Sequence, residues 1–200
     1  MQTGLFQTVV TALIVMAYYV VDFILIAHYD RERAKQKSGR NWRFTLFALT
    51  VAAVIVLQPL VLPALSFSIQ AGWGLWIQVL GIALASLGLA IHVWARIHLG
   101  RFYAERVEVI AGHQVINTGP YAYVRHPIIS SFFLLVIGLA LINPALTTVF
   151  LVLYTFWDFS GAARKEEQKL SQLPGYSAYM QRTTRFFPNA RQVVAAFRKK

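Results

Sequence analysis

Residues 117–127 read NTGPYAYVRHP, and they separate three long apolar segments from two shorter ones. Gly119-Pro120 predicts a turn, because proline presets φ and glycine tolerates a positive φ. After this turn, Tyr121 and Tyr123 are expected to alternate along a short extended piece. The stretch is too polar to be a transmembrane segment itself, so we expect a loop at a membrane surface.

The end of this loop combines a cation, a titratable ring and the start of a helix. Pro127 suits the first turn of the following helix, where its missing N–H costs nothing. Arg125 and His126 then lie beside a helix N-terminus, an arrangement that favours an anion site. The alternative is a juxtamembrane loop whose arginine and histidine meet lipid phosphates.

Composition excludes an ordinary soluble domain, because 57% of the residues are hydrophobic, only 14% are charged and the mean hydropathy is +0.53. A chain of 200 residues fits one compact domain, so residues 1–200 are expected to form a single membrane domain. The sequence has no cysteine, which excludes a disulfide framework, a thiolate metal site and a cysteine nucleophile.

The apolar segments predict an all-α integral membrane protein with about five transmembrane helices. Residues 4–97 hold three N-terminal spans, each long enough to cross roughly 30 Å of hydrocarbon. The last two segments are shorter, and the Asn-Pro pair between them predicts a short helical hairpin. A polar, basic tail that includes a helix is expected from Ser160 onward. The predicted segments are Gly4–Ala27, Phe44–Leu65, Trp73–Ile97, Ile128–Ile142 and Ala145–Phe159.

Positive charge is confined to three alternate connections. Residues 28–43 hold six Lys and Arg, residues 96–125 hold four and residues 164–200 hold nine, which accounts for all 19. If all five segments cross, these regions share one face, and the positive-inside rule places that face in the cytoplasm and the N-terminus outside. Attraction to anionic lipid explains the net charge of +11, and nucleic-acid binding is not needed.

One face of the third segment carries small and polar residues at helical spacing. Its members are Gly81, Ala85, Gly88, His92 and Arg96. Small residues let helix backbones approach closely, so this face is expected to pack inward. His92 should meet other polar groups near the cytoplasmic side, and that contact can be purely structural.

Asp22 stands out in the first segment, because a carboxylate is costly in lipid and should face protein or water. Tyr18, one turn earlier, or a partner on the second segment is expected to satisfy it.

The sequence lacks several motifs of soluble enzymes. It has no G-x-G-x-x-G after a strand, no G-x-S-x-G and no H-E-x-x-H. Its five histidines show no close metal-ligand spacing, so we assign no metal.

Three strings together resemble the isoprenylcysteine carboxyl methyltransferase family, whose relatives include phospholipid N-methyltransferases. They are WARIHLGRFY (residues 94–103), GHQVINTGPYAYVRHP (112–127) and EEQKLSQLPGYSAYMQRTTRFFP (166–188). The resemblance implies a multi-span enzyme that binds S-adenosylmethionine at the cytosolic face, here of a bacterial-type plasma membrane or an equivalent, and methylates a lipophilic or prenylated acceptor. Residues 98–188 would then hold the cofactor-binding loop, the helical hairpin and the tail.

The resemblance also implies which residues form the site. Glu166 or Glu167 would hold the amino-acid end of the cofactor. Apart from the resemblance, we expect the polar head of an amphiphilic acceptor to lie beside Arg125 and Arg164, near the sulfonium. The other residues implied to line the cofactor pocket are His113, Gln114, Val115, Ile116, Tyr121, His126 and Pro127.

The chemistry of S-adenosylmethionine agrees with this placement. Arg125, His126 and the following helix start suit its carboxylate, and a tail glutamate suits its ammonium. The ring of Tyr121 or Tyr123 can stack on adenine or face the sulfonium. A lipid carboxylate acceptor is already ionised at neutral pH and needs no general base.

The chain departs from the usual family pattern at three places. Ile129 stands where a tyrosine is usual, and Ala162 stands where many relatives carry an arginine, so that Arg164 is the nearest substitute. The tail is also shorter around residues 173–175. Two other classes stay open: a sterol-reductase-like NADPH enzyme of related architecture, and a non-catalytic membrane scaffold protein.

Overall fold

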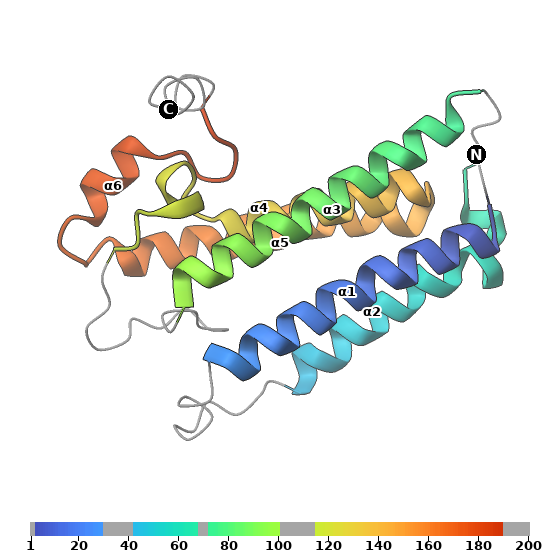
Figure 1. The fold of residues 1–200 in the computed structure, drawn as a ribbon, viewed down its shortest axis with the longest axis horizontal. Coiled ribbons are helices and arrows are strands. Elements are labelled where there is room, and N and C mark those ends of the chain that lie inside the picture. The colour runs from blue at the N-terminus through green and yellow to red at the C-terminus, as the bar shows by residue number, and fades with distance from the viewer. Residues whose placement is uncertain (1–2, 30–41, 68–71, 101–114, 190–200) are drawn as a thin grey trace.

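A computed structural model describes residues 3–29, 42–67, 72–100 and 115–189. Within these ranges the protein is built from helices, with two isolated β-bridges and no longer strand, which confirms the all-α prediction for this part of the chain (Figure 1). The elements are α1 (Leu5–Tyr29), α2 (Trp42–Val61), η1 (Pro63–Leu65), α3 (Gly74–Leu99), η3 (Gly119–Ala122), α4 (Pro127–Ile142), α5 (Leu146–Leu170) and α6 (Tyr176–Arg182).

Three of the described helices are long and apolar enough to cross a membrane: Leu5–His28, Gly74–Leu99 and Leu146–Leu170. Residues 49–61 of α2 and residues 127–142 of α4 are shorter apolar helices. These helices make the chain an integral membrane protein.

The second helix of the hairpin was expected to end at Phe159, but α5 continues to Leu170. The prediction followed hydropathy, which falls at Ser160. Helix propensity does not fall there, because residues 162–170 (AARKEEQKL) are nearly all strong helix formers. Glu166 and Glu167 therefore lie on the last turns of α5 itself, and the separate tail helix, α6, has only seven residues.

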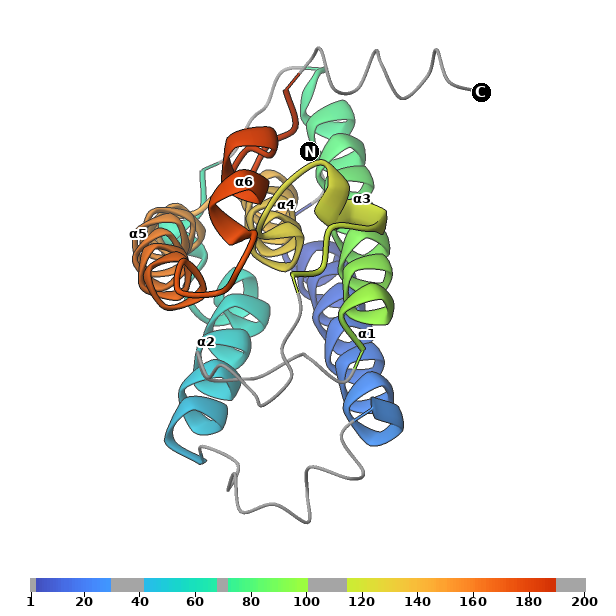
Figure 2. The same ribbon diagram turned by 90° about the vertical axis from the view of Figure 1, so that its left-hand side faces the viewer.

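The long helices run side by side in two layers. Figures 1 and 2 show α4 between α3 and α5, with the α1–α2 hairpin packed against this layer. At one end of the bundle, α6 and η3 lie over the C-terminal end of α5 and the start of α4. The loop and the tail are thus brought together at a single end of the molecule.

The small face of α3 packs inward, as predicted, and the structure shows that its glycines meet α4. Gly81, Ala85, Gly88, His92 and Arg96 are all buried. A Cβ at Gly81 would lie 2.7 Å from the carbonyl oxygen of a glycine on α4, and one at Gly88 would lie 2.7 Å from another α4 carbonyl. Close backbone approach is therefore what these glycines permit.

Polar side chains join the helices at the end opposite the loop and tail. Gln7 of α1 and Gln78 of α3 both donate to the carbonyl oxygen of Ile142, at 3.2 and 3.1 Å. The amide of Asn143 donates to Gln58 of α2 at 2.7 Å. These four amide side chains are at most 2% exposed, so their hydrogen bonds hold the ends of α1 to α4 together in an apolar setting.

The partner of Asp22 differs from the expectation. Its Oδ1 lies 3.3 Å from Nε2 of His92 and 3.7 Å from Nε of Arg96, both on α3. Tyr18 instead directs its hydroxyl to the carbonyl oxygen of Ser131, at 3.5 Å. The sequence shows which residues are neighbours along one helix, but the partners of Asp22 depend on how α1 packs against α3, so the prediction was wrong.

Candidate functional site

The loop before α4 is a tight helical turn. The extended piece predicted for Tyr121 and Tyr123 is wrong, because η3 spans Gly119–Ala122 and the N–H of Tyr123 donates to the carbonyl oxygen of Pro120. Proline favours this turn as well, since its fixed φ suits the first position of a helix. Gly119 has φ of +57°, and any Cβ there would overlap the ring of His98. Only glycine fits this position without strain.

Pro127 opens α4, as predicted, and the loop before it pairs with the tail. The backbone N–H of Arg125 donates to the carbonyl oxygen of Thr184 at 2.9 Å, and the backbone N–H of His126 donates to the carbonyl oxygen of Arg185 at 3.1 Å. These backbone bonds place both side chains of the loop against the end of α5.

Glu167 is the centre of the resulting cluster and is 5% exposed. Its Oε1 accepts from Nε of Arg125 at 2.8 Å and lies 3.1 Å from Nε2 of His126. Arg185 binds both carboxylate oxygens, with its closest contact 2.6 Å from Oε2. A buried carboxylate with three cationic partners is well satisfied, so Glu167 ties the loop, α5 and the tail together.

Glu166 faces outward beside the same histidine. Its side chain is 40% exposed, and its Oε2 lies 3.4 Å from Nδ1 of His126. Burial lowers the pKa of His126, but hydrogen bonds and charges from Glu166 and Glu167 outweigh this effect and raise that pKa above its ordinary value. His126 therefore keeps its positive charge to higher pH than a free histidine and orients Glu166.

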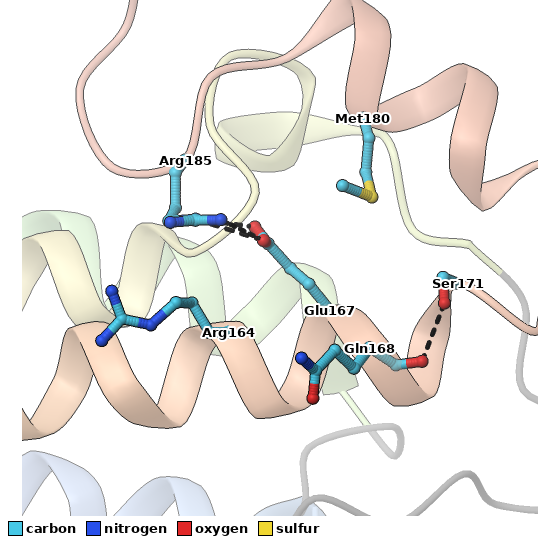
Figure 3. Close-up of a pocket in the computed structure, with 6 residues that line it drawn as sticks. All are labelled: Arg164, Glu167, Gln168, Ser171, Met180 and Arg185. Atoms are coloured by element: carbon cyan, nitrogen blue, oxygen red, sulfur yellow. Dashed lines mark hydrogen bonds and ion pairs between the residues drawn. The ribbon is translucent and has the colours of Figure 1, made fainter.

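The two arginines expected beside the acceptor have different settings. Besides Glu167, Arg125 donates to the carbonyl oxygens of Met180 and Thr183 and is 10% exposed. Arg164 is exposed on α5. It lines a hollow of about 360 Å³ at the junction of α5 and α6 (Figure 3). The lining residues are Arg164, Glu167, Gln168, Ser171, Met180 and Arg185.

The remaining predicted residues lie on or before the loop. Val115 and Ile116 are partly buried, and His113 and Gln114 fall outside the described residues. Tyr121 is buried, and its carbonyl oxygen accepts from the hydroxyl of Tyr179 at 2.8 Å. Burial raises the pKa of Tyr179 to about 12, so it stays a neutral donor.

Sequence reasoning missed Arg185 and Tyr179. Both lie within the tail string that carried the resemblance, but nothing in the sequence separates Arg185 from the other basic residues of the tail. Its pairing with Glu167 arises only when the tail folds back.

Residues 80–172 match the model of the isoprenylcysteine carboxyl methyltransferase (ICMT) family. The matched region covers just under half of the chain, and it supports the resemblance to that family. The matched region begins in α3 and ends just after α5. It therefore contains the loop, α4 and both glutamates.

Two curated relatives are similar at lower coverage. The cobalt-zinc-cadmium resistance protein CzcN of Cupriavidus metallidurans is 28% identical over 130 residues, which cover 64% of this chain and 58% of the relative. The nickel-cobalt-cadmium resistance protein NccN of Alcaligenes xylosoxydans xylosoxydans is 27% identical over 117 residues, 57% of this chain and 49% of the relative. The chain thus spans about half the length of these relatives.

A solved structure shares the fold. The eukaryotic intramembrane Ras methyltransferase ICMT superposes with a TM-score of 0.62 at 23% identity. The superposition covers 90% of this chain and 67% of that structure. The likeness therefore extends well beyond residues 80–172.

Proposed function

We propose that this protein is an integral-membrane methyltransferase that uses S-adenosylmethionine and acts on a lipophilic acceptor. The observation that carries the proposal is the different setting of the two glutamates. The carboxylate of Glu167 is buried and paired with Arg125, His126 and Arg185. The carboxylate of Glu166 is partly exposed and is held by a charged His126. This pair lies within the region that matches the methyltransferase family.

The donor set fits the cofactor. Glu166 is the available carboxylate for the cofactor's ammonium group, and the N-terminal end of α4 next to His126 suits its carboxylate. Val115, Ile116, Tyr121 and Pro127, with His113 and Gln114 before them, would line the remainder of the pocket. The tie between loop and tail would fix all of these groups before the cofactor arrives, which lowers the cost of ordering them.

When bound, S-adenosylmethionine supplies an electrophilic methyl group on a sulfonium. The protein's part is to align the acceptor with that methyl group and to exclude water, since an in-line displacement needs no proton transfer from an ionised acceptor. Arg164 would hold the acceptor's polar head. Arg125 would act through Glu167, because its guanidinium is already bound to that carboxylate and to two carbonyl oxygens.

Calorimetric titration with S-adenosylhomocysteine, on protein in detergent, tests the proposal. His126→Ala and Glu166→Gln should each weaken binding by about 1–3 kcal/mol, the range for a lost charge-assisted contact. Asp158→Asn is the matched control, since it also removes a carboxylate from α5 and should bind as wild type.

Two results would reject this assignment. Binding of NADPH in place of S-adenosylhomocysteine would favour a sterol-reductase-like enzyme, and binding of neither would favour a scaffold. The family match does not favour either alternative.

We also propose that the shorter helices α2 and α4 cross the membrane together with α1, α3 and α5, with the N-terminus outside and the glutamate pair on the cytoplasmic face. Cysteines at Thr3, Gly72 and Ser177, all exposed, can be labelled with an impermeant reagent in intact cells. The first two should react and Ser177→Cys should not, because every Lys and Arg lies on the side of Ser177. The reverse pattern would refute this topology.

A further inference from the structure

Ser130 joins the first turn of α4 to the tail. Its side chain is 6% exposed, and its hydroxyl lies 2.6 Å from the carbonyl oxygen of Phe186 and 3.0 Å from that of His126. A serine inside a helix can donate its single proton to the carbonyl oxygen four residues earlier. Here the shorter contact is to the tail, so the proton is donated mainly to Phe186. The hydroxyl thereby links two segments that are 56 residues apart.

The ring of Phe186 contacts both His126 and the aromatic core. Its centroid lies 6.0 Å from that of the imidazole, with the two planes inclined at 48°. It also lies 5.1 Å from the centroid of Phe133, edge to face. Phe133 is fully buried and stacks on Phe156 of α5 at 3.9 Å. Aromatic pairs in such arrangements are favourable beyond the area that they bury, so Phe186 has a fixed place beside the imidazole.

The imidazole of His126 has to keep one orientation. Its Nδ1 lies 3.4 Å from Glu166, and its Nε2 lies 3.1 Å from Glu167. Rotation about χ2 of a histidine is soft, and the contact to Glu166 is the longer one, so a small rotation would lose it first. The other charged groups of the cluster, Arg125 and Arg185, are paired with Glu167 and do not hold Glu166 in place. A neighbouring ring that limits the rotation would therefore protect the contact to Glu166.

We propose that Ser130 and Phe186 are positioning residues for the amino-acid end of the cofactor. Ser130 holds the tail against α4, the tail places the Phe186 ring on His126, and the ring keeps His126 turned toward Glu166. Both residues act through His126 and not by touching the cofactor. This inference rests on the proposed function, in which Glu166 binds the cofactor's ammonium group, and it makes cofactor affinity depend on how the tail is seated.

Amide hydrogen exchange tests the seating of the tail without any ligand. The backbone N–H groups of Arg125 and His126 donate to tail carbonyl oxygens, so they exchange when the tail lifts. In Ser130→Ala in detergent, these amides should exchange about three- to tenfold faster, the effect of one lost hydrogen bond, while those of α3 keep their rates. Ser131→Ala is the matched control. Its hydroxyl is also buried on α4 but donates to the carbonyl oxygen of Ile128 within the helix, so loop exchange should match wild type.

Calorimetric titration with S-adenosylhomocysteine tests the positioning. Ser130→Ala and Phe186→Leu should each raise the dissociation constant about three- to tenfold, whereas Ser131→Ala should not. Phe187→Leu is the control for the ring, since this neighbouring phenylalanine is 55% exposed, and it should bind like wild type. Ser130→Thr and Ser130→Val have the same shape and differ in the hydroxyl, so the threonine variant should bind more tightly.

A double-mutant cycle with His126→Ala identifies the path of the effect. If Ser130 acts through His126, Ser130→Ala weakens binding in the wild type but has no further effect on protein that already lacks the imidazole. A residue that only stabilises the fold would cause the same loss in both backgrounds. Thermal unfolding of each variant checks that it is folded at the temperature of the titration.

Three outcomes would overturn the inference: wild-type affinity of Ser130→Ala, an equal loss in Ser131→Ala, or additive losses in the cycle. The two proposals fail in different ways. If the wild-type protein does not bind S-adenosylhomocysteine, the cofactor assignment fails, and faster exchange in Ser130→Ala then limits Ser130 to holding the tail. If the wild type binds and Ser130→Ala binds equally well, the positioning inference alone fails.

Discussion

Replacing Glu167 by glutamine is expected to free the tail from the loop and to lower the free energy of unfolding by about 3 kcal/mol. Breaking a buried ion pair costs about 3–5 kcal/mol, because the surviving charge is left uncompensated. Here Arg125 and His126 lose a buried partner, while Arg185 is 36% exposed and can turn to water, so the lower end applies. S-adenosylhomocysteine binding should fall with the loss of loop order.

Denaturant unfolding in detergent measures this effect. Glu166→Gln is the control, since it changes the adjacent carboxylate, which is 40% exposed and forms an ion pair with His126. It should weaken cofactor binding with little change in stability. If Glu167→Gln is as stable as the wild type and Glu166→Gln loses much of its free energy of unfolding, then Glu166 is the structural carboxylate and Glu167 the cofactor-binding one.

Gly138→Ala is expected to be the most damaging single-methyl change in the helix bundle. The added Cβ would lie 2.6 Å from the carbonyl oxygen of Gly81 and 2.8 Å from the backbone nitrogen of Ala85. Both are backbone atoms, so the methyl group can be accommodated only by moving α3 away from α4. Overpacking of this kind costs about 1–3 kcal/mol, and we expect the upper end, since no side chain can yield.

Gly161→Ala provides the comparison for this prediction. It makes the same change on a helix where the Cβ meets open space, and it should stabilise the protein by about 1 kcal/mol through helix propensity. Thermal unfolding of both variants in one detergent gives the difference directly. Equal melting temperatures would show that α3 and α4 are not in close backbone contact.

Several features of the fold follow from residues close together in the chain. The apolar segments and the confinement of Lys and Arg to three connections already indicate a membrane protein and a topology. The inward face of α3 was visible as small residues at helical spacing, because a helix repeats its faces every three or four residues. Pro127 likewise marked the start of α4, since proline fits a first helical turn.

The end of α5 shows why one local signal is not enough. Hydropathy and helix propensity agree along most of the chain, but they diverge after Ser160, where residues become polar and stay helix-forming. Hydropathy alone led to the prediction that the helix ends at Phe159. The helix instead continues beyond its apolar part and carries both glutamates on its last turns.

The family motifs, and with them both glutamates and the RHP string, could be recognised from the sequence by itself, because these residues lie within short contiguous strings. Only the tertiary structure decided that Glu167 is buried and that Glu166 is partly exposed. Glu166 and Glu167 differ by about 100° around the same helix, and no local property says which direction meets the tail. That direction is set by Arg125 and Arg185, which lie 42 and 18 residues from Glu167 and reach it only through folding. Contacts at such separations depend on how whole helices and the tail pack, so the partners of Glu167 and of Asp22 could be learned only from the folded chain.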